Sequence, residues 1–209
     1  MTLRDITIAM ATGTPEWPGD TPFSCSWAWR IARGDSVNVS SVTTSPHVGT
    51  HADAPLHVHD GWPSAEALPL DAFHGAAVVC TIPADRDRVD LRDVADLPAG
   101  HIERLLLRTG RSIAGGSFPE AWPSLSPAAV RELIARGLRL LGTDSPSVDP
   151  RTDTELSVHH ELFRGGACIL ENLDLHAIPN GTYELTAYPL KIAGADAAPV
   201  RAVLRDLPA

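Results

Sequence analysis

A short segment of the chain concentrates side chains that can bind a metal ion or transfer a proton. Three histidines and one aspartate, His47, His51, Asp53 and His57, fall within eleven residues. Neutral imidazole nitrogens and carboxylate oxygens suit zinc, with manganese and iron as competitors. The alternative is a polar loop that happens to be rich in histidine, and four such groups at this density make it the poorer explanation. The segment therefore predicts a metal site.

The residues between these side chains indicate their local structure. Pro46, Gly49 and Pro55 interrupt any regular helix through the segment. A strand followed by a turn can instead direct the imidazoles and the carboxylate at one point, and Gly49 relaxes the backbone where the chain bends.

A second group of candidate ligands lies about 110 residues further along the chain. His159 and His160 precede an apolar run that Glu171 closes. A carboxylate at the end of a core strand is costly to bury without a partner, and a metal ion or a histidine would remove that cost. Only the fold can bring these residues to the first cluster, so their spacing alone does not identify Glu171 as a ligand.

The elements that must position these groups are mostly strands. Short runs of apolar or β-branched residues recur between turn signals. They predict strands over residues 3–9, 37–44, 76–82, 105–107, 138–141 and 183–192.

Two helices are expected beside these strands. Ser126 can cap a helix that runs to Arg136, with Pro127 in its first position and Gly137 after its last turn. A second helix is expected near residues 155–164, and residues 110–123 form a loop. No change of composition divides the chain, so residues 1–209 are predicted to form one strand-dominated α/β or α+β domain, with its chemistry on loops that leave the strands.

Composition narrows the class of protein. The chain has 209 residues and a net charge of -9 with scattered basic residues, which argues against a nucleic-acid partner. No run approaches the roughly 20 apolar residues of a membrane span, and no secretory signal is recognisable. Three cysteines, Cys25, Cys80 and Cys168, are widely spaced. An odd, small number fits a reducing compartment, so we expect a cytoplasmic protein.

The first cluster also resembles a known signature. His47-x-Gly49-Thr50-His51-x-Asp53-Ala54-Pro55-x-His57 is similar to the motif of the cyclase family of metal hydrolases. Within that family the chain looks most like the bacterial kynurenine formamidases, or arylformamidases. The resemblance covers essentially the whole chain and extends to residues 14–23, 142–150, 183–191 and 199–204.

The resemblance implies a site with two metal ions, expected to be zinc, with manganese or iron as alternatives. His47, His51 and Asp53 would hold one ion and His159 the other, while Asp53 and Glu171 would touch both. His159 is preferred to His160 because the family places its histidine twelve residues before the glutamate. His57 matches the family's proton donor and acceptor, and Trp17 its substrate-contacting aromatic residue.

The same resemblance implies a fold and a reaction. The fold would be β-rich, with a small barrel-like sheet and peripheral helices, in a homodimer or higher homo-oligomer whose N-terminal loop can complete a neighbour's pocket. The reaction would be hydrolysis of N-formyl-L-kynurenine to L-kynurenine and formate in tryptophan degradation. Phe23 and Trp62 are further candidates for an apolar pocket wall, or else for packing.

Two departures from the formamidase pattern leave other functions open. Ser157 stands where formamidases commonly have an aspartate, and the close formamidases vary at Asn172-Leu173. A related hydrolase acting on isatin or another cyclic or acylated arylamine would use the same metal site. A non-catalytic metal sensor would need no acid–base histidine or aromatic loop, and a scaffold would leave the cluster unexplained.

Overall fold

The protein is described by a computed structural model for residues 2–83 and 85–207. Within these residues a mixed sheet has the strand order β1-β13-β11-β5-β7-β9-β10-β4-β12. Its four middle strands, β5, β7, β9 and β10, run parallel to one another. Each outer strand is antiparallel to its neighbours. The strands are β1 (Leu3–Asp5), β4 (His51–Asp53), β5 (His74–Thr81), β7 (Arg104–Arg108), β9 (Leu140–Thr143), β10 (Cys168–Glu171), β11 (Gly181–Thr186), β12 (Ala197–Pro199) and β13 (Val203–Asp206).

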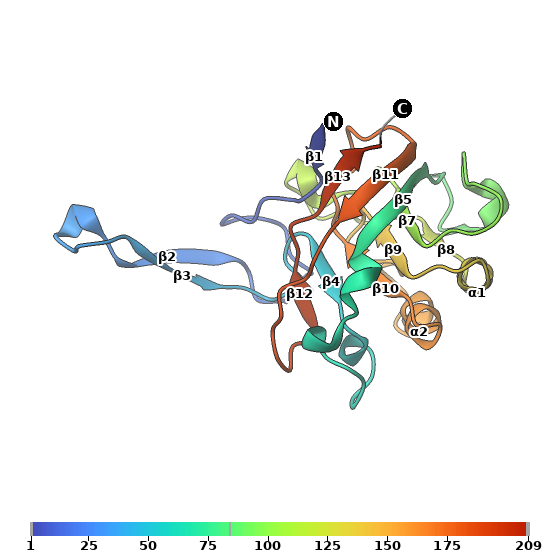
Figure 1. Ribbon diagram of the computed structural model, residues 1–209. Helices are drawn as coiled ribbons and strands as arrows, with labels where there is room; N and C mark the ends of the chain where they lie inside the picture. Colours follow the sequence, from blue (N-terminus) through green and yellow to red (C-terminus); the bar gives the residue numbers. More distant parts are fainter. Residues whose placement is uncertain (1, 84, 208–209) are drawn as a thin grey trace.

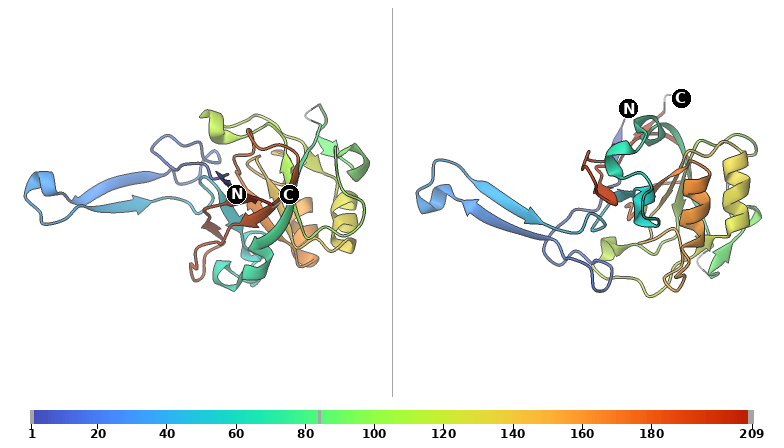
Figure 2. Two further views of the ribbon diagram at one scale, coloured as in Figure 1. Left: turned by 45° about the horizontal axis from the view of Figure 1, so that its top comes forward. Right: turned by 90° about the horizontal axis from the view of Figure 1, so that it is seen from below.

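The sheet curls into a half-barrel and separates two apolar cores (Figures 1 and 2). Alternate residues of one strand enter different cores, since Leu106 packs in one and Leu105 and Leu107 in the other. The helices α1 (Pro127–Ala135) and α2 (Ser157–Arg164) cover one face of the sheet. Within the described residues, no helix has the length and apolar character needed to span a membrane.

Helix α1 begins where the sequence indicated. The Ser126 hydroxyl accepts a hydrogen bond from the Ala129 amide and so caps α1, and Gly137 adopts the left-handed conformation just after the helix. Helix α2 starts at Ser157, slightly later than expected, after Leu156 in a left-handed conformation.

Two predicted strands are too long. Residues 3–9 were expected to be one strand, but β1 ends at Asp5. Residues 183–192 were expected to be one strand, but β11 ends at Thr186. Pro189 has no amide hydrogen to continue the ladder, and beyond β11 it forms only an isolated bridge with Val200.

Among the described strands, β2 (Ser24–Trp29) and β3 (Val39–Thr43) pair only with each other. They form a hairpin, here called the arm, which projects away from the body (Figures 1 and 2). Every residue of both strands is exposed. A second small sheet pairs β6 (Arg88–Val89) with β8 (Ser124–Leu125) near the helices.

Candidate metal centre

The centre of the site is built on two antiparallel strands. In β4, His51 and Asp53 are two residues apart and therefore project from the same face. Strand β10 pairs with β4 so that Glu171 lies opposite His51. Just before β4, Gly49 turns the chain at φ 71°, and a Cβ there would lie 2.8 Å from the Met10 Cγ atom. This tight turn brings His47 back over the strand.

Three side chains from this segment converge on one point. The His47 Nδ1 atom lies 3.1 Å from Asp53 Oδ1 and 3.2 Å from His51 Nε2. His51 Nε2 lies 3.2 Å from the same Asp53 oxygen. Two nitrogen or oxygen ligands of a tetrahedral zinc ion, each about 2.0–2.1 Å from the metal, lie about 3.3–3.4 Å apart. The three separations therefore suit a small ion with these ligands.

A second group shares the same carboxylates from the other side. The His159 Nε2 atom lies 3.2 Å from Asp53 Oδ2 and 3.4 Å from Glu171 Oε1. The other Glu171 oxygen lies 3.6 Å from His51 Nε2. Asp53 and Glu171 thus each direct one carboxylate oxygen to the first group and the other oxygen to the second. The structure brings together all five residues expected to hold metal: His47, His51, Asp53, His159 and Glu171.

Each of the three histidines has an outer hydrogen-bond acceptor that fixes its tautomer. His51 Nδ1–H donates to the Gly49 carbonyl at 2.9 Å, and His159 Nδ1–H donates to Asp149 at 2.7 Å. His47 Nε2–H donates to Asp196 at 2.9 Å. Carbonyl and carboxylate oxygens only accept, so these ring nitrogens carry the hydrogen. The inner nitrogen of each ring then has its lone pair free for a metal. In metal proteins, ligand histidines are oriented in this way by an acceptor on their outer nitrogen.

The inner atoms cannot lie this close without positive charge between them. With the tautomers given above, His47 Nδ1, His51 Nε2 and Asp53 Oδ1 are all acceptors. Asp53 is fully buried, and its Oδ1 atom has no hydrogen-bond partner among the residues that the structure describes. A buried carboxylate oxygen without a partner is costly. A metal ion satisfies all three atoms at once, so the residues fit such a group.

The pKa values of the site also indicate that its carboxylates stabilise positive charge. Burial acts to lower the pKa of His47, but the adjacent carboxylates of Asp196 and Asp53 outweigh burial and raise the pKa to about 10. For His159, burial is likewise outweighed, by Asp149, Asp53 and Glu171, and its pKa is raised well above the usual value. Burial acts to raise the pKa of Asp53, yet the neighbouring histidines hold that pKa well below its usual range. The buried carboxylates therefore attract cations, whether protons or metal ions.

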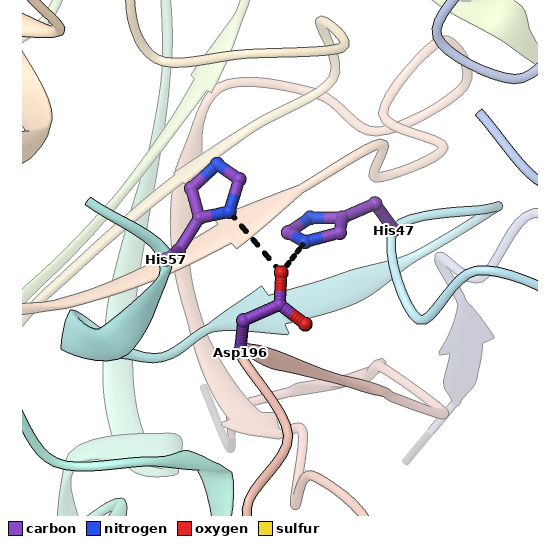
Figure 3. Close-up of side chains that lie close together, drawn as sticks. All are labelled: His47, His57 and Asp196. Atoms are coloured by element: carbon purple, nitrogen blue, oxygen red, sulfur yellow. Dashed lines mark hydrogen bonds and ion pairs between the residues drawn. The ribbon is translucent and has the colours of Figure 1, made fainter. Parts of the chain in front are cut away.

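His57 lies at the edge of this cluster, on the 3-10 turn Pro55–His57 that follows β4. Its ring centroid is 4.4 Å from that of His47 and 5.7 Å from that of His159. Its Nδ1 atom faces Asp196 Oδ2 at 3.5 Å, as Figure 3 shows. His57 is more exposed than the inner histidines and lines the cavity above them.

A cavity of about 310 Å³ opens above the cluster. Trp17 and Phe118 line it, in an edge-to-face contact with ring centroids 5.5 Å apart. Trp122 packs against both rings and donates from its indole nitrogen to the Asp149 carbonyl at 2.8 Å. Phe118 comes from the loop 110–123.

Neither alternative aromatic candidate lines this cavity, and neither does the second histidine. Trp62 stacks on His59 with ring centroids 4.7 Å apart, and Phe23 lies outside the lining. His160 points to Trp62, with ring centroids 5.9 Å apart, so His159 is the histidine that faces the carboxylates.

The sequence did not single out Asp149, Asp196 or Phe118. Asp149 precedes α2, where its carboxylate accepts from the Val158 and His159 amides as well as from the His159 ring. An aspartate shortly before a predicted helix was the available signal. Asp196 and Phe118 lie in loops, and no pattern in the sequence links either of them to the first cluster.

The fold and the site together define a family. Residues 4–150 match the family model described as "Putative cyclase", and the chain belongs to this cyclase family.

Among its relatives, kynurenine formamidase from Salinibacter ruber (strain DSM 13855 / M31) is 42% identical over 212 residues, covering 100% of this chain and 99% of the relative. A solved structure described as a potential metal-dependent hydrolase with cyclase activity is 28% identical and has a TM-score of 0.84. The match covers 100% of this chain and 99% of that one. Isatin hydrolase A from Labrenzia aggregata has the same fold, with a TM-score of 0.78 and 23% identity over 97% of this chain and 93% of that one.

Proposed function

We propose that this protein is a metal-dependent hydrolase that converts N-formyl-L-kynurenine to L-kynurenine and formate in tryptophan degradation. The observation that carries the proposal is the convergence of three histidine nitrogens on the two oxygens of the buried Asp53. The full-length similarity to a kynurenine formamidase supports the substrate.

The two groups of ligands support a site for two ions. His47, His51 and Asp53 would hold one ion, and His159 would hold the second together with the bridging carboxylates of Asp53 and Glu171. Imidazole and carboxylate ligands suit zinc, with manganese and iron as alternatives. Divalent ions held there would supply an activated water and polarise the formyl oxygen of the substrate.

The protein's own residues complete the reaction. The amine nitrogen of the substrate is a poor leaving group unless it is protonated, so an acid must deliver a proton as the C–N bond breaks. We assign this role to His57, because it lines the cavity beside the ligand histidines. An imidazole can give and regain a proton near neutral pH.

The aromatic wall of the cavity suits an aryl substrate. Trp17 and Phe118 present aromatic surface on the lining that also contains His57. The aryl ring of formylkynurenine would pack against Trp17 and leave its formyl group over Asp53. The limited volume of about 310 Å³ fits a small molecule.

The arm supports a homodimer. Six apolar side chains are at least 39% exposed on its strands and connecting turn, namely Trp27, Trp29, Ile31, Val37, Val39 and Val42. A two-stranded hairpin is marginally stable by itself, and exposed apolar surface of this kind marks an interface. We propose that a second copy of the chain covers the arm.

Two further parts of the proposal concern the whole molecule. We propose that residues 1–209 fold as one domain, because the long sheet joins β1 near one end of the chain to β13 near the other. None of the three cysteines is paired and two are buried, which supports a cytoplasmic protein.

The proposal is tested by reconstitution. The purified protein is stripped with a chelator, zinc, manganese or iron is restored separately, and hydrolysis of N-formyl-L-kynurenine is followed by the absorbance of kynurenine. Activity that chelation abolishes and one metal restores is expected, at two ions per subunit by elemental analysis. Stoichiometric metal binding without hydrolysis would refute the substrate, and faster hydrolysis of isatin would identify the related hydrolase instead.

A further inference from the structure

Asp196 lies beside the metal centre although it is far from the motif in sequence. Strand β12 pairs with β4 so that Ala197 lies opposite Asp53. The Ala54 amide donates to the Asp196 carbonyl at 2.8 Å. This backbone contact fixes Asp196 at the end of β4, where the chain turns into the residues that carry His57.

One oxygen of the Asp196 carboxylate contacts two histidines of the site (Figure 3). Its Oδ2 atom lies 2.9 Å from His47 Nε2 and 3.5 Å from His57 Nδ1. Among the described residues, the carboxylate has no hydrogen bond with any other side chain. Its side-chain contacts therefore serve the site and not the packing of the body.

The two other ligand histidines show what such a contact does. His51 is oriented by a backbone carbonyl and His159 by Asp149, which is held by two further amide hydrogen bonds. His47 has only Asp196 in this role. Its ring is also the most exposed of the three, at 18% against 1% and 2%. The orientation of His47 therefore depends on Asp196 more than that of the others depends on any one group.

A direct role for Asp196 in holding metal is less consistent with this geometry. Asp196, His47 and His57 do lie close enough to surround an ion. A neutral imidazole, however, has one lone pair and one N–H group. The Nδ1 atom of His47 faces Asp53 and His51, so its lone pair is committed there and its hydrogen lies on Nε2, toward Asp196.

We propose that Asp196 is a positioning residue shared by His47 and His57. It keeps the hydrogen of His47 on Nε2, so that Nδ1 remains available as a metal ligand. The same oxygen accepts from Nδ1–H of His57 and leaves the other nitrogen of that ring toward the cavity for proton transfer. The role of Asp196 on His57 rests on the proposed function. Its role on His47 does not, because it concerns metal binding alone.

The experiment compares Asp196→Ala and Asp196→Asn with wild type, using Asp206→Asn as the matched control. Asp206 is also a partly exposed carboxylate, but it pairs with Arg4 on the far strands of the sheet. Zinc affinity is measured by competition with a chromogenic chelator, without substrate, and zinc stoichiometry by elemental analysis. Loss of such an outer partner typically weakens affinity about 10–100-fold. We expect that loss in Asp196→Ala, a smaller one in Asp196→Asn, unchanged stoichiometry, and wild-type behaviour in the control.

A second measurement addresses His57. At saturating zinc, Asp196→Ala should lower kcat in the wild-type background and have a much smaller effect in a His57→Ala background, because the shared step is already lost. Loss of one zinc ion per subunit in the Asp196 variants would make Asp196 a ligand and overturn the inference. Unchanged zinc affinity would overturn it as well. A wild-type protein that binds zinc but does not hydrolyse formylkynurenine would refute the proposed function while the affinity comparison still tests Asp196 on His47.

Discussion

Removing the metal should lower the thermal stability of this protein, and the change can be estimated from Asp53. This carboxylate is fully buried, and within the described part of the chain its Oδ1 atom has no hydrogen-bond partner. A buried acceptor left unsatisfied costs about 1–3 kcal/mol. An ion present at about 1,000 times its Kd stabilises the folded state by about 4.1 kcal/mol.

These free energies convert into a measurable shift in Tm. For a chain of this length, 1 kcal/mol corresponds to about 2–4 °C. The unsatisfied oxygen alone then accounts for about 2–12 °C, and the binding equilibrium for about 8–16 °C. The two ranges overlap near 10 °C, which is the expected fall in Tm on chelation.

The measurement is a thermal melt with chelator and with increasing zinc. Asp53→Asn should abolish the zinc-dependent shift, because it removes the charge that both ligand groups share. The control Asp206→Asn should keep the shift. If Tm is unchanged after elemental analysis confirms that the metal is gone, then Asp53 is satisfied in some other way and the reasoning is refuted.

Four further outcomes are expected. His57→Ala should lower turnover by about 10²–10⁴-fold while metal content stays at the wild-type value; loss of the metal would make His57 a ligand. Trp17→Ala removes an aromatic contact worth about 0.5–1.5 kcal/mol, so KM should rise about 2–12-fold with a smaller change in kcat, and an unchanged KM would assign Trp17 to packing.

Partial burial acts to raise the pKa of Asp153, but hydrogen bonds from Ser157 and Arg88 outweigh it and lower the pKa to about 2. Because the pKa of Asp153 is lower in the folded state, its ionised carboxylate stabilises the fold at pH values above the usual pKa of an aspartate. This stabilisation is lost as the pH falls through about 2. After allowance for screening, Asp153→Asn should cost about 1 kcal/mol at pH 7 and only a small fraction of that at pH 2 in urea melts; an equal cost at both pH values would refute this. Replacing Trp27 and Trp29 by serine should convert a dimer to a 22.3 kDa monomer in light scattering, whereas a monomeric wild type would refute the dimer.

Local sequence patterns predicted much of the fold. The strands at residues 76–82 and 105–107 and the helix after Ser126 depend on nearby residues, namely apolar or β-branched runs and a capping serine, and the structure confirms them. Strand β4 was harder, because three residues between two turns carry almost no periodicity. The arm was only half predicted: residues 37–44 suggested β3, but its apolar side chains gave no sign that they would be exposed.

The site divides in the same way. Residues 47–57 are adjacent in sequence, so their spacing alone pointed to a metal centre. His159 and Glu171 needed the resemblance, because only the fold brings them near Asp53. Glu171 arrives through the pairing of β4 with β10, and His159 arrives from helix α2. Asp196 and Phe118 could not be found by either route, since their roles depend on where loops lie after the sheet has closed. The metal and acid–base roles themselves stay predictions.

The pairing of β4 with later strands also determines when the site can exist during synthesis. Asp53 contacts His159, which is 106 residues later, and His47 contacts Asp196, which is 149 residues later. A ribosome must therefore have synthesised the chain as far as Asp196 before all of these groups can meet. A chain that is truncated before β12 would still carry the histidine-rich motif yet lack the Asp196 carboxylate that contacts His47.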